Sequence, residues 1–314
     1  MQRIDFSAVV PVYRGRETID ELCSRLIEFF TARGCTFEII LVDDGSTDGS
    51  WQRIQAIAAN EPRVLGVRLT RNFGQHNATI CGFRHANGEM IVTLDEDLQN
   101  PPEQIGKLAD CQARENADVV YGIPESRRDS RLRRIGSRLA MLIPRHVMNV
   151  NFDISAFRLL RAPIAREISR ALRHDIIIDV CCAWVTDRIV ATRVEHVESS
   201  RRESSYTLLK LARVLFNMLY NYTVLPLRFS ILVGGALSGV SMLFAGYFIY
   251  VRFTQEVGVP GFSALIVSVL FSTGVILLGI GLMSEYLAHT FLHVIRKPQS
   301  VIRETTSGSP ASDS

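Results

Sequence analysis

The chain has 314 residues, of which 47% are hydrophobic and 21% are charged, and its formal net charge is +3 at pH 7. A chain of this length can hold one large domain and something smaller, and no nucleic-acid partner is predicted. The six cysteines form no CxxC pair and no His/Cys spacing typical of zinc sites, which favours scattered apolar residues in a reducing compartment. The N-terminus shows no signal-peptide core, so the first half is expected to stay in the cytosol.

The first 125 residues alternate between strand and helix patterns. Strands are predicted over 6–12, 37–42, 64–69, 90–94 and 118–121, with helices over roughly 17–33, 49–59, 75–87 and 102–116. This alternation predicts a parallel sheet with right-handed crossovers. The strands are nearly all apolar, as expected where helices cover both faces. The predicted fold class is α/β, with a mostly parallel, Rossmann-like sheet.

A basic block follows this region. Between Arg127 and Arg173 there are twelve arginines, opposed only by Asp129, Asp153 and Glu167. Such a block suits phosphates, pyrophosphates or a membrane face, and a solvated surface of basic helices is the alternative. Just beyond it, Cys181 and Cys182 lie in an apolar, strand-like run and are predicted to be core residues.

The second half contains two apolar runs, 229–251 and 262–283. Each is long enough to span a hydrocarbon core of about 30 Å. Basic residues crowd their outer flanks, so the positive-inside rule predicts a two-helix transmembrane hairpin with both ends in the cytoplasm. The preceding segment, 206–225, is amphipathic and fits either an interfacial helix or an ordinary packed helix. The polar tail after Pro298 is predicted to be partly disordered.

The most informative motif follows the apolar run 90–94. Asp95 and Asp97, with Gln99 two residues on, offer hard oxygen ligands for one Mg²⁺ or Mn²⁺ shared with substrate phosphates. An acidic turn is the alternative for such a motif in isolation. Ligands bind at the carboxyl ends of strands in open α/β sheets, which favours the metal interpretation.

Other strand ends carry polar groups that suit a nucleotide. Asp43 and Asp44 can bond a ribose hydroxyl or a base N–H, although capping of the next helix explains one acid there. Pro11 and Tyr13 offer a fixed turn and a ring against which a base can pack. Arg71, after the third strand, can neutralise phosphate.

Together these segments resemble glycosyltransferase family 2, and more closely its membrane-anchored polyprenyl-phosphate branch. The resemblance covers about residues 7 to 300. It is carried by RNFGQHNA (71–78), LDEDLQNPPE (94–103), SSYTL (204–208), PLR (226–228) and SEY (284–286). These segments are similar to those of bacterial undecaprenyl-phosphate aminoarabinose transferases, polyprenyl-phosphate glucosyltransferases and dolichol-phosphate mannose synthases.

The resemblance implies a GT-A fold and a role for each matching residue. A metal and donor-diphosphate role is implied for Asp95, Asp97 and Gln99, and a nucleotide-binding role for Pro11, Tyr13, Asp43 and Asp44. A lipid-phosphate and pyrophosphate role is implied for Arg127, Arg133 and Ser137, and an acceptor-side role for Asp153 and Arg158. It also implies a multi-pass protein of the bacterial inner membrane that forms a homo-oligomer, a tetramer by analogy with relatives.

Four departures from the family pattern stand out. The usual Tyr-Asn-Glu after the first strand is Tyr13-Arg14-Gly15, and the usual Ala within the acidic motif is Glu96. The usual Gly-x-Arg after the fifth strand is Gly122-Ile123-Pro124, so that arginine's role is either lost or passes to Arg127. The usual Arg-x-x-Gly is shortened to 201–203, without glycine.

The expected reaction is transfer of a sugar from a nucleotide sugar, UDP-linked by resemblance, to polyprenyl (undecaprenyl) phosphate with inversion. The acceptor is already an anion, so no strong base is required, and Asp153 would orient the phosphate or a sugar hydroxyl. The expected parts are a nucleotide-sugar domain (1–125), an acceptor segment (126–225), the hairpin (226–290) and the tail (291–314). The rivals are a processive polysaccharide synthase, whose Gln-x-x-Arg-Trp motif is lacking, a nucleotidyltransferase and a non-catalytic scaffold. The sequence does not identify the sugar.

Overall fold

The computed structural model describes residues 3–125, 154–170, 177–197, 225–254, 262–294 and 298–306. It comprises two compact units. The first combines residues 1–205 with residues 296–314, and the second consists of residues 206–295. The chain therefore returns to its first unit after the second has been completed.

The first unit is built on a mixed sheet of eight strands within the described residues, ordered β7-β5-β6-β4-β1-β2-β3-β8. The strands are β1 (Phe6–Val12), β2 (Phe37–Asp43), β3 (Val64–Leu69), β4 (Met90–Thr93), β5 (Val119–Pro124), β6 (Arg158–Arg161), β7 (Ile189–Val194) and β8 (Ile302–Thr305). β1 runs parallel to β2 and β4, β2 to β3, and β5 to β7. β6 and β8 are antiparallel to their neighbours. The predicted mostly parallel sheet is confirmed.

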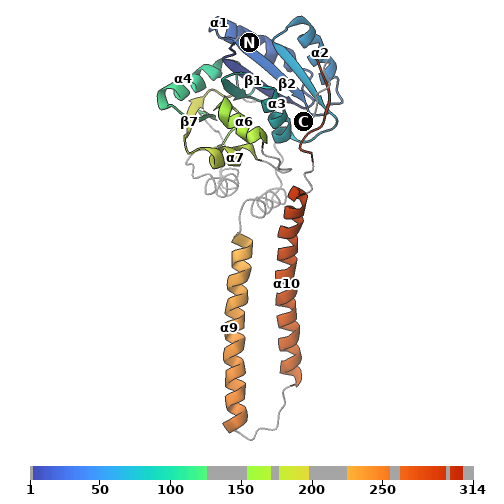
Figure 1. Ribbon diagram of the computed structural model, residues 1–314, viewed down its shortest axis with the longest axis vertical. Helices are drawn as coiled ribbons and strands as arrows, with labels where there is room; N and C mark the ends of the chain where they lie inside the picture. Colours follow the sequence, from blue (N-terminus) through green and yellow to red (C-terminus); the bar gives the residue numbers. More distant parts are fainter. Residues whose placement is uncertain are drawn as a thin grey trace. The chain divides into compact units, whose positions relative to one another are not determined.

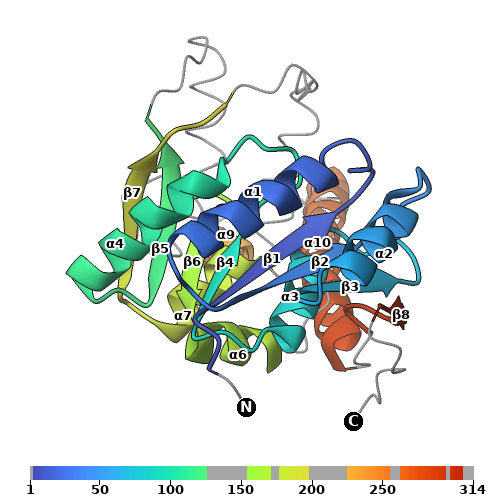
Figure 2. The same cartoon turned by 90° about the horizontal axis from the view of Figure 1, so that it is seen from above.

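Helices cover both faces of this sheet (Figures 1 and 2). They are α1 (Ile19–Ala32), α2 (Ser50–Asn60), α3 (Gln75–His85), α4 (Ile105–Glu115), α6 (Ala162–Arg170) and α7 (Ile178–Val185), with a 3₁₀ turn at Pro102–Gln104. Residues of α1, α2 and α4 join one apolar core, and those of α3, α6 and α7 join the other. Cys181 and Cys182 are buried as predicted, but they lie in helix α7 and not in a strand. A run that is apolar on all sides fits a buried helix and a buried strand equally well.

The alternation of side chains along β1 shows why both faces are covered. Val10 belongs to the core beneath α1, whereas its neighbour Val9 belongs to the core beneath α3. Both are fully buried, because successive side chains of a strand point to opposite faces. A strand buried in this way holds its carboxyl end firmly, and Pro11 and Tyr13 are placed there.

The edge of the sheet at β3 is covered by β8, which comes from the end of the chain (Figure 2). The backbone N–H of Gly66 donates to Thr306 Oγ1 at 2.9 Å, and Arg68 Nη1 donates to Glu304 at 2.9 Å. The prediction of a disordered tail is therefore corrected for residues 298–306. A polar strand that covers an exposed edge satisfies its backbone groups, a reason that local sequence does not reveal.

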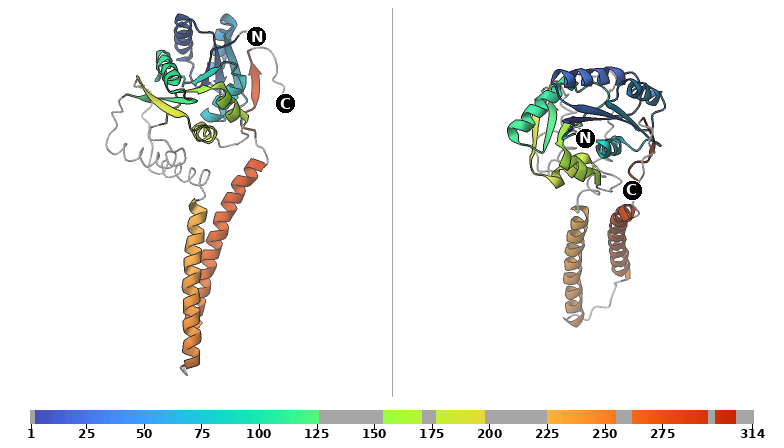
Figure 3. Two further views of the ribbon diagram at one scale, coloured as in Figure 1. Left: turned by 60° about the vertical axis from the view of Figure 1, so that its left-hand side comes forward. Right: turned by 45° about the horizontal axis from the view of Figure 1, so that its top comes forward.

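The second unit contains two long apolar helices, α9 (Leu225–Thr254) and α10 (Phe262–Val294), which run side by side (Figure 3). They contain the two predicted apolar runs. Large apolar side chains on both remain exposed, and Leu243 is 77% exposed. Within the described residues, one helix meets the length and composition expected of a membrane span, over Phe271–Ala288. The two-span hairpin thus stays a prediction, and the amphipathic segment 206–224 lies outside the described residues.

Candidate active site

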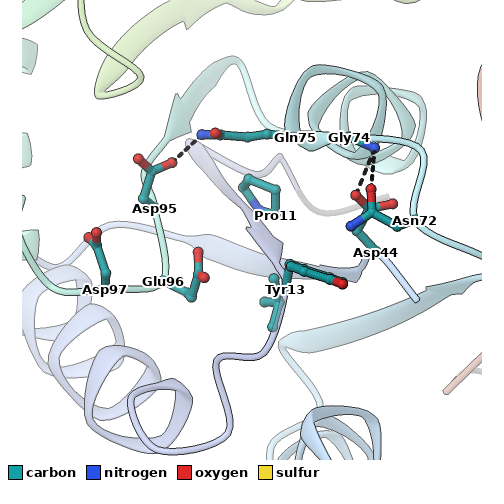
Figure 4. Close-up of a pocket in the computed structure, with 10 residues that line it drawn as sticks. Pro11, Tyr13, Asp44, Asn72, Gly74, Gln75, Asp95, Glu96 and Asp97 are labelled. Carbon is teal, nitrogen blue, oxygen red and sulfur yellow. Dashed lines mark hydrogen bonds between the residues drawn. The ribbon is translucent and has the colours of Figure 1, made fainter. Parts of the chain in front are cut away.

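A pocket lies at the carboxyl ends of β1, β2 and β4 (Figure 4). It is lined by Pro11, Val12, Tyr13, Asp44, Asn72, Gly74, Gln75, Asp95, Glu96 and Asp97. β1 lies between β2 and β4, and the crossovers from β1 to β2 and from β3 to β4 cover opposite faces. A crevice forms at such a reversal of strand order, outside the carboxyl ends of the strands.

The loop after β4 brings three carboxylates to this pocket. Asp95 and Asp97 flank Glu96, and all three line the cavity. Gln75, in the first turn of α3, donates a hydrogen bond to Asp95, and the backbone N–H of Gln99 donates to Asp97 at 3.2 Å. Leu98, the next residue, has φ +60°, which is uncommon for a residue with a branched side chain. The loop is thus held in one specific conformation.

The carboxylates of the acidic loop fit as ligands of a divalent cation that takes further ligands from its substrate. Carboxylate oxygens are the hard ligands that Mg²⁺ and Mn²⁺ prefer, and Mg²⁺ commonly uses one or two carboxylates together with substrate phosphates. Within the described ranges, no group of three His, Cys, Asp or Glu side chains is arranged to hold a metal ion. Asp95 and Asp97 therefore fit as a partial ligand set on an open pocket.

Asp44 fixes the loop on the opposite side of the pocket. Its two carboxylate oxygens accept hydrogen bonds from the backbone N–H groups of Phe73 (2.7 Å) and Gly74 (2.8 Å). Burial raises the pKa of Asp44, although these N–H groups and Arg71 oppose the shift. Gly45 has φ +70°, and a Cβ there would lie 2.6 Å from the carbonyl carbon of Arg71. Glycine at 45 allows the loops after β2 and β3 to touch.

Three predicted residues do not line the pocket. Asp43 is fully buried, accepts a hydrogen bond from the Ser46 N–H at 3.2 Å and lies 3.5 Å from Arg68 Nε. Burial also raises its pKa. The guanidinium of Arg71 lies over the Phe73 ring, 4.4 Å from its centroid. Gln99 contributes its backbone to the loop. Of the paired acids at the end of β2, the structure therefore brings Asp44 to the pocket and turns Asp43 into the core.

Arg158 lies in the core and does not line the pocket. Its side chain is 4% exposed and is ion-paired with Asp179, which also accepts a hydrogen bond from the Tyr121 hydroxyl at 2.9 Å. Burial lowers the pKa of the neighbouring His76; Asp179 opposes that shift and Arg158 adds to it. A guanidinium enclosed in this way supports the site from within the core, and the acceptor-side role of Arg158 stays a prediction.

The remaining predicted residues, Arg127, Arg133, Ser137 and Asp153, lie outside the described residues. The pocket also contains residues to which no binding role was assigned, namely Asn72, Gly74, Gln75 and Glu96. In the run 71–76, which carries part of the family resemblance, a ligand-binding role was predicted for Arg71 alone. Asn72, Gly74 and Gln75 could have been found from the position of this polar, glycine-containing segment between the end of a strand and the start of a helix.

Comparison with protein families gives a match to the model described as glycosyl transferase family 2 over residues 7–191. A protein of Shewanella sediminis is 33% identical over 99% of this chain and 97% of its own length. One of Pseudomonas aeruginosa strain PAO1 is 35% identical over 97% of this chain and 92% of its own. Both are named undecaprenyl-phosphate 4-deoxy-4-formamido-L-arabinose transferase.

Among solved structures, the chain is similar to glucosyl-3-phosphoglycerate synthase from Mycobacterium tuberculosis, determined in complex with Mn²⁺, UDP and phosphoglyceric acid. The TM-score is 0.52 at 18% identity, covering 69% of this chain and 76% of that one. This similarity concerns the fold. It supports the GT-A-like architecture of the sheet and its helices.

Proposed function

Because the chain belongs to glycosyl transferase family 2, we propose that it transfers a sugar from a UDP-sugar to undecaprenyl phosphate. The family match includes the whole of the pocket. The acceptor is proposed from the names of relatives that are similar over nearly their full length. Those names also make 4-deoxy-4-formamido-L-arabinose the first sugar to test, although identities of 33–35% leave room for another.

One observation in the structure carries the proposal. The carboxylates of Asp95 and Asp97 and the ring of Tyr13 lie around a single pocket at adjacent strand ends (Figure 4). A nucleoside diphosphate has a flat base at one end and a charged diphosphate at the other. Tyr13 and Pro11 suit the base, and the acidic loop suits a cation-bound diphosphate.

The reaction needs alignment and charge stabilisation more than proton transfer. An oxygen of the lipid phosphate attacks the anomeric carbon while the bond to the nucleoside diphosphate breaks on the opposite face, which inverts the configuration. Asp95 and Asp97 would hold the divalent cation, which supplies positive charge for the departing diphosphate. Asp44 keeps the loop of Gly74 and Gln75 in place, and Gln75 in turn orients Asp95. Arg127, Arg133, Ser137 and Asp153 remain proposed for the acceptor side.

The second unit supplies the proposed membrane attachment. α9 and α10 expose large apolar side chains along their lengths, among them Leu243, Phe244, Leu277 and Met283. Exposed apolar surface of this extent marks contact with lipid or another apolar partner. Basic residues flank the pair in the sequence, which supports a hairpin with both ends in the bacterial cytoplasm. The hairpin would tether the protein to the membrane that contains the polyprenyl phosphate.

The test is lipid-dependent release of UDP by the purified full-length protein. UDP-4-deoxy-4-formamido-L-arabinose and other UDP-sugars are supplied with Mn²⁺, with and without undecaprenyl phosphate. The proposal predicts that one donor releases UDP only when the lipid is present. Absence of lipid-dependent release from every donor, with protein that is folded by thermal melting, would contradict it.

A further inference from the structure

At the pocket, the loop after β1 lies close to the acidic loop after β4. A Cβ at Gly15 would lie 2.7 Å from Cγ of Glu96 and 3.4 Å from its Cβ. The first distance is shorter than real Cβ contacts, so the Glu96 side chain already occupies the space that a side chain at position 15 would need. Gly15 is buried, and its φ is not in the left-handed region. Space, and not backbone conformation, therefore requires glycine there.

Hydrogen bonds hold the backbone around Gly15 in place. The carbonyl oxygen of Gly15 accepts hydrogen bonds from the N–H groups of Thr18 (3.0 Å) and Ile19 (3.2 Å), where α1 begins. The N–H of Arg14 donates to Ser46 Oγ at 3.0 Å, and Arg14 has φ +60°. A larger residue at 15 would therefore move the Glu96 side chain rather than the backbone.

Two departures from the family pattern become one feature in this contact. The family pattern that the chain resembles has a glutamate at the position of Gly15 and an alanine at the position of Glu96, whereas this chain has glycine at 15 and glutamate at 96. The position that lacks the usual carboxylate, Gly15, is thus a neighbour in space of the position that carries an additional one, Glu96. The pocket keeps a carboxylate at this point but takes it from the loop after β4.

We propose that Glu96 is a binding residue for the nucleoside part of the donor, and that Gly15 makes the room it needs. This inference rests on the proposed function. An ionised carboxylate accepts hydrogen bonds and donates none, so the partner of Glu96 is an N–H or O–H group. Glu96 lies between the acidic pair and Tyr13 in the pocket (Figure 4), and a nucleoside offers ribose hydroxyls and a base N–H there.

The test measures the dissociation constant of UDP by calorimetry on the full-length protein with Mn²⁺ present. Glu96→Ala is expected to weaken UDP binding by roughly tenfold, the loss of one hydrogen bond to a charged group. Gly15→Ala should weaken it as well, by displacing Glu96. In the Glu96→Ala background, Gly15→Ala should add little, because the collision is gone. Glu28→Ala, on the exposed face of α1, is the matched control.

The exchange Gly15→Glu with Glu96→Ala is the sharpest variant. It returns a carboxylate to the same space from the other loop, and it is expected to recover most of the affinity lost in Glu96→Ala. Repeating the titrations with 2′-deoxy-UDP and with CDP distinguishes a ribose hydroxyl from the uracil N–H. If Glu96→Ala and the wild type bind one of these ligands equally well, the group that this ligand lacks is the partner of Glu96.

Two results would overturn the inference while leaving the proposed function intact. One is wild-type UDP affinity in Glu96→Ala. The other is a parallel loss of Mn²⁺ affinity in that variant, which would make Glu96 a metal ligand. If the wild-type protein itself bound no UDP, the proposed function would fail and this inference with it.

Discussion

Arg158 and Asp179 form an ion pair inside the protein, with side chains only 4% and 11% exposed. The pair joins β6 to α7, and β6 lies against β4, whose end leads into Asp95. The Tyr121 hydroxyl donates to the same carboxylate oxygen. A buried network of charged and polar side chains thus connects the strands next to the acidic loop with helix α7.

Removing one partner of this pair should strongly destabilise the first unit. Arg158→Ala leaves Asp179 buried without its counter-charge, at an expected loss of about 3–5 kcal/mol in unfolding free energy. The double variant Arg158→Met with Asp179→Leu should lose less, because no charge remains buried. Thermal melting of the purified protein measures both. Equal melting temperatures for Arg158→Ala and wild type would show that the pair contributes no stability.

Asp97→Asn should lower turnover by roughly 10²–10³-fold, the usual effect of removing one group that stabilises transition-state charge. The change keeps the shape of the side chain and removes its charge. Asp110→Asn, an exposed acid on α4, is the matched control and should retain activity. EDTA should reproduce the loss in the wild type, and Mn²⁺ should reverse it. Wild-type turnover by Asp97→Asn would remove Asp97 from the metal site.

The strand at the end of the chain should stabilise the first unit. Thr306→Val removes the acceptor for the Gly66 N–H and is expected to cost about 0.5–1.5 kcal/mol. Arg303→Gln, on an exposed position of β8, should cost less. A chain ending at residue 297 should melt at a lower temperature than either variant. If that shortened chain melted with the wild type, β8 would be dispensable for the fold.

The membrane arrangement can be tested at Gly258, which lies in the sequence between α9 and α10. A cysteine at this position should react with a membrane-impermeant maleimide in intact cells, because the link is proposed to lie outside the cytoplasm. The natural cysteines all precede residue 183 and serve as internal controls that stay unlabelled. Labelling at 258 only after lysis would contradict the two-span hairpin.

Much of the first unit follows from local sequence. The bounds of β1 and β3 agree with the predicted strands, since each is an apolar run between polar turns. β6, β7 and β8 were not predicted, and β6 and β8 each have only four residues and charged members. Their strand conformation depends on partners distant in the chain, β4 and β5 for β6 and β3 for β8.

The site divides in a similar way. Tyr13, Asp44, Asp95 and Asp97 could be placed at the pocket because polar residues at the ends of parallel strands meet at one edge of a sheet. Whether Asp43 or Asp44 faces the pocket depends on the residue at which the strand ends, and the sequence does not reveal that residue. The burial of Arg158 could not be predicted because its partner, Asp179, becomes its neighbour only in the folded protein.

Mass spectrometry of the lipid product tests the central claim most directly. The purified protein is incubated with undecaprenyl phosphate, Mn²⁺ and a panel of UDP-sugars, in parallel with Asp97→Asn. The account predicts a single glycosyl phosphate lipid, formed from one donor by the wild type and lost in Asp97→Asn. Formation of no such lipid from any donor, by protein that binds UDP, would contradict it.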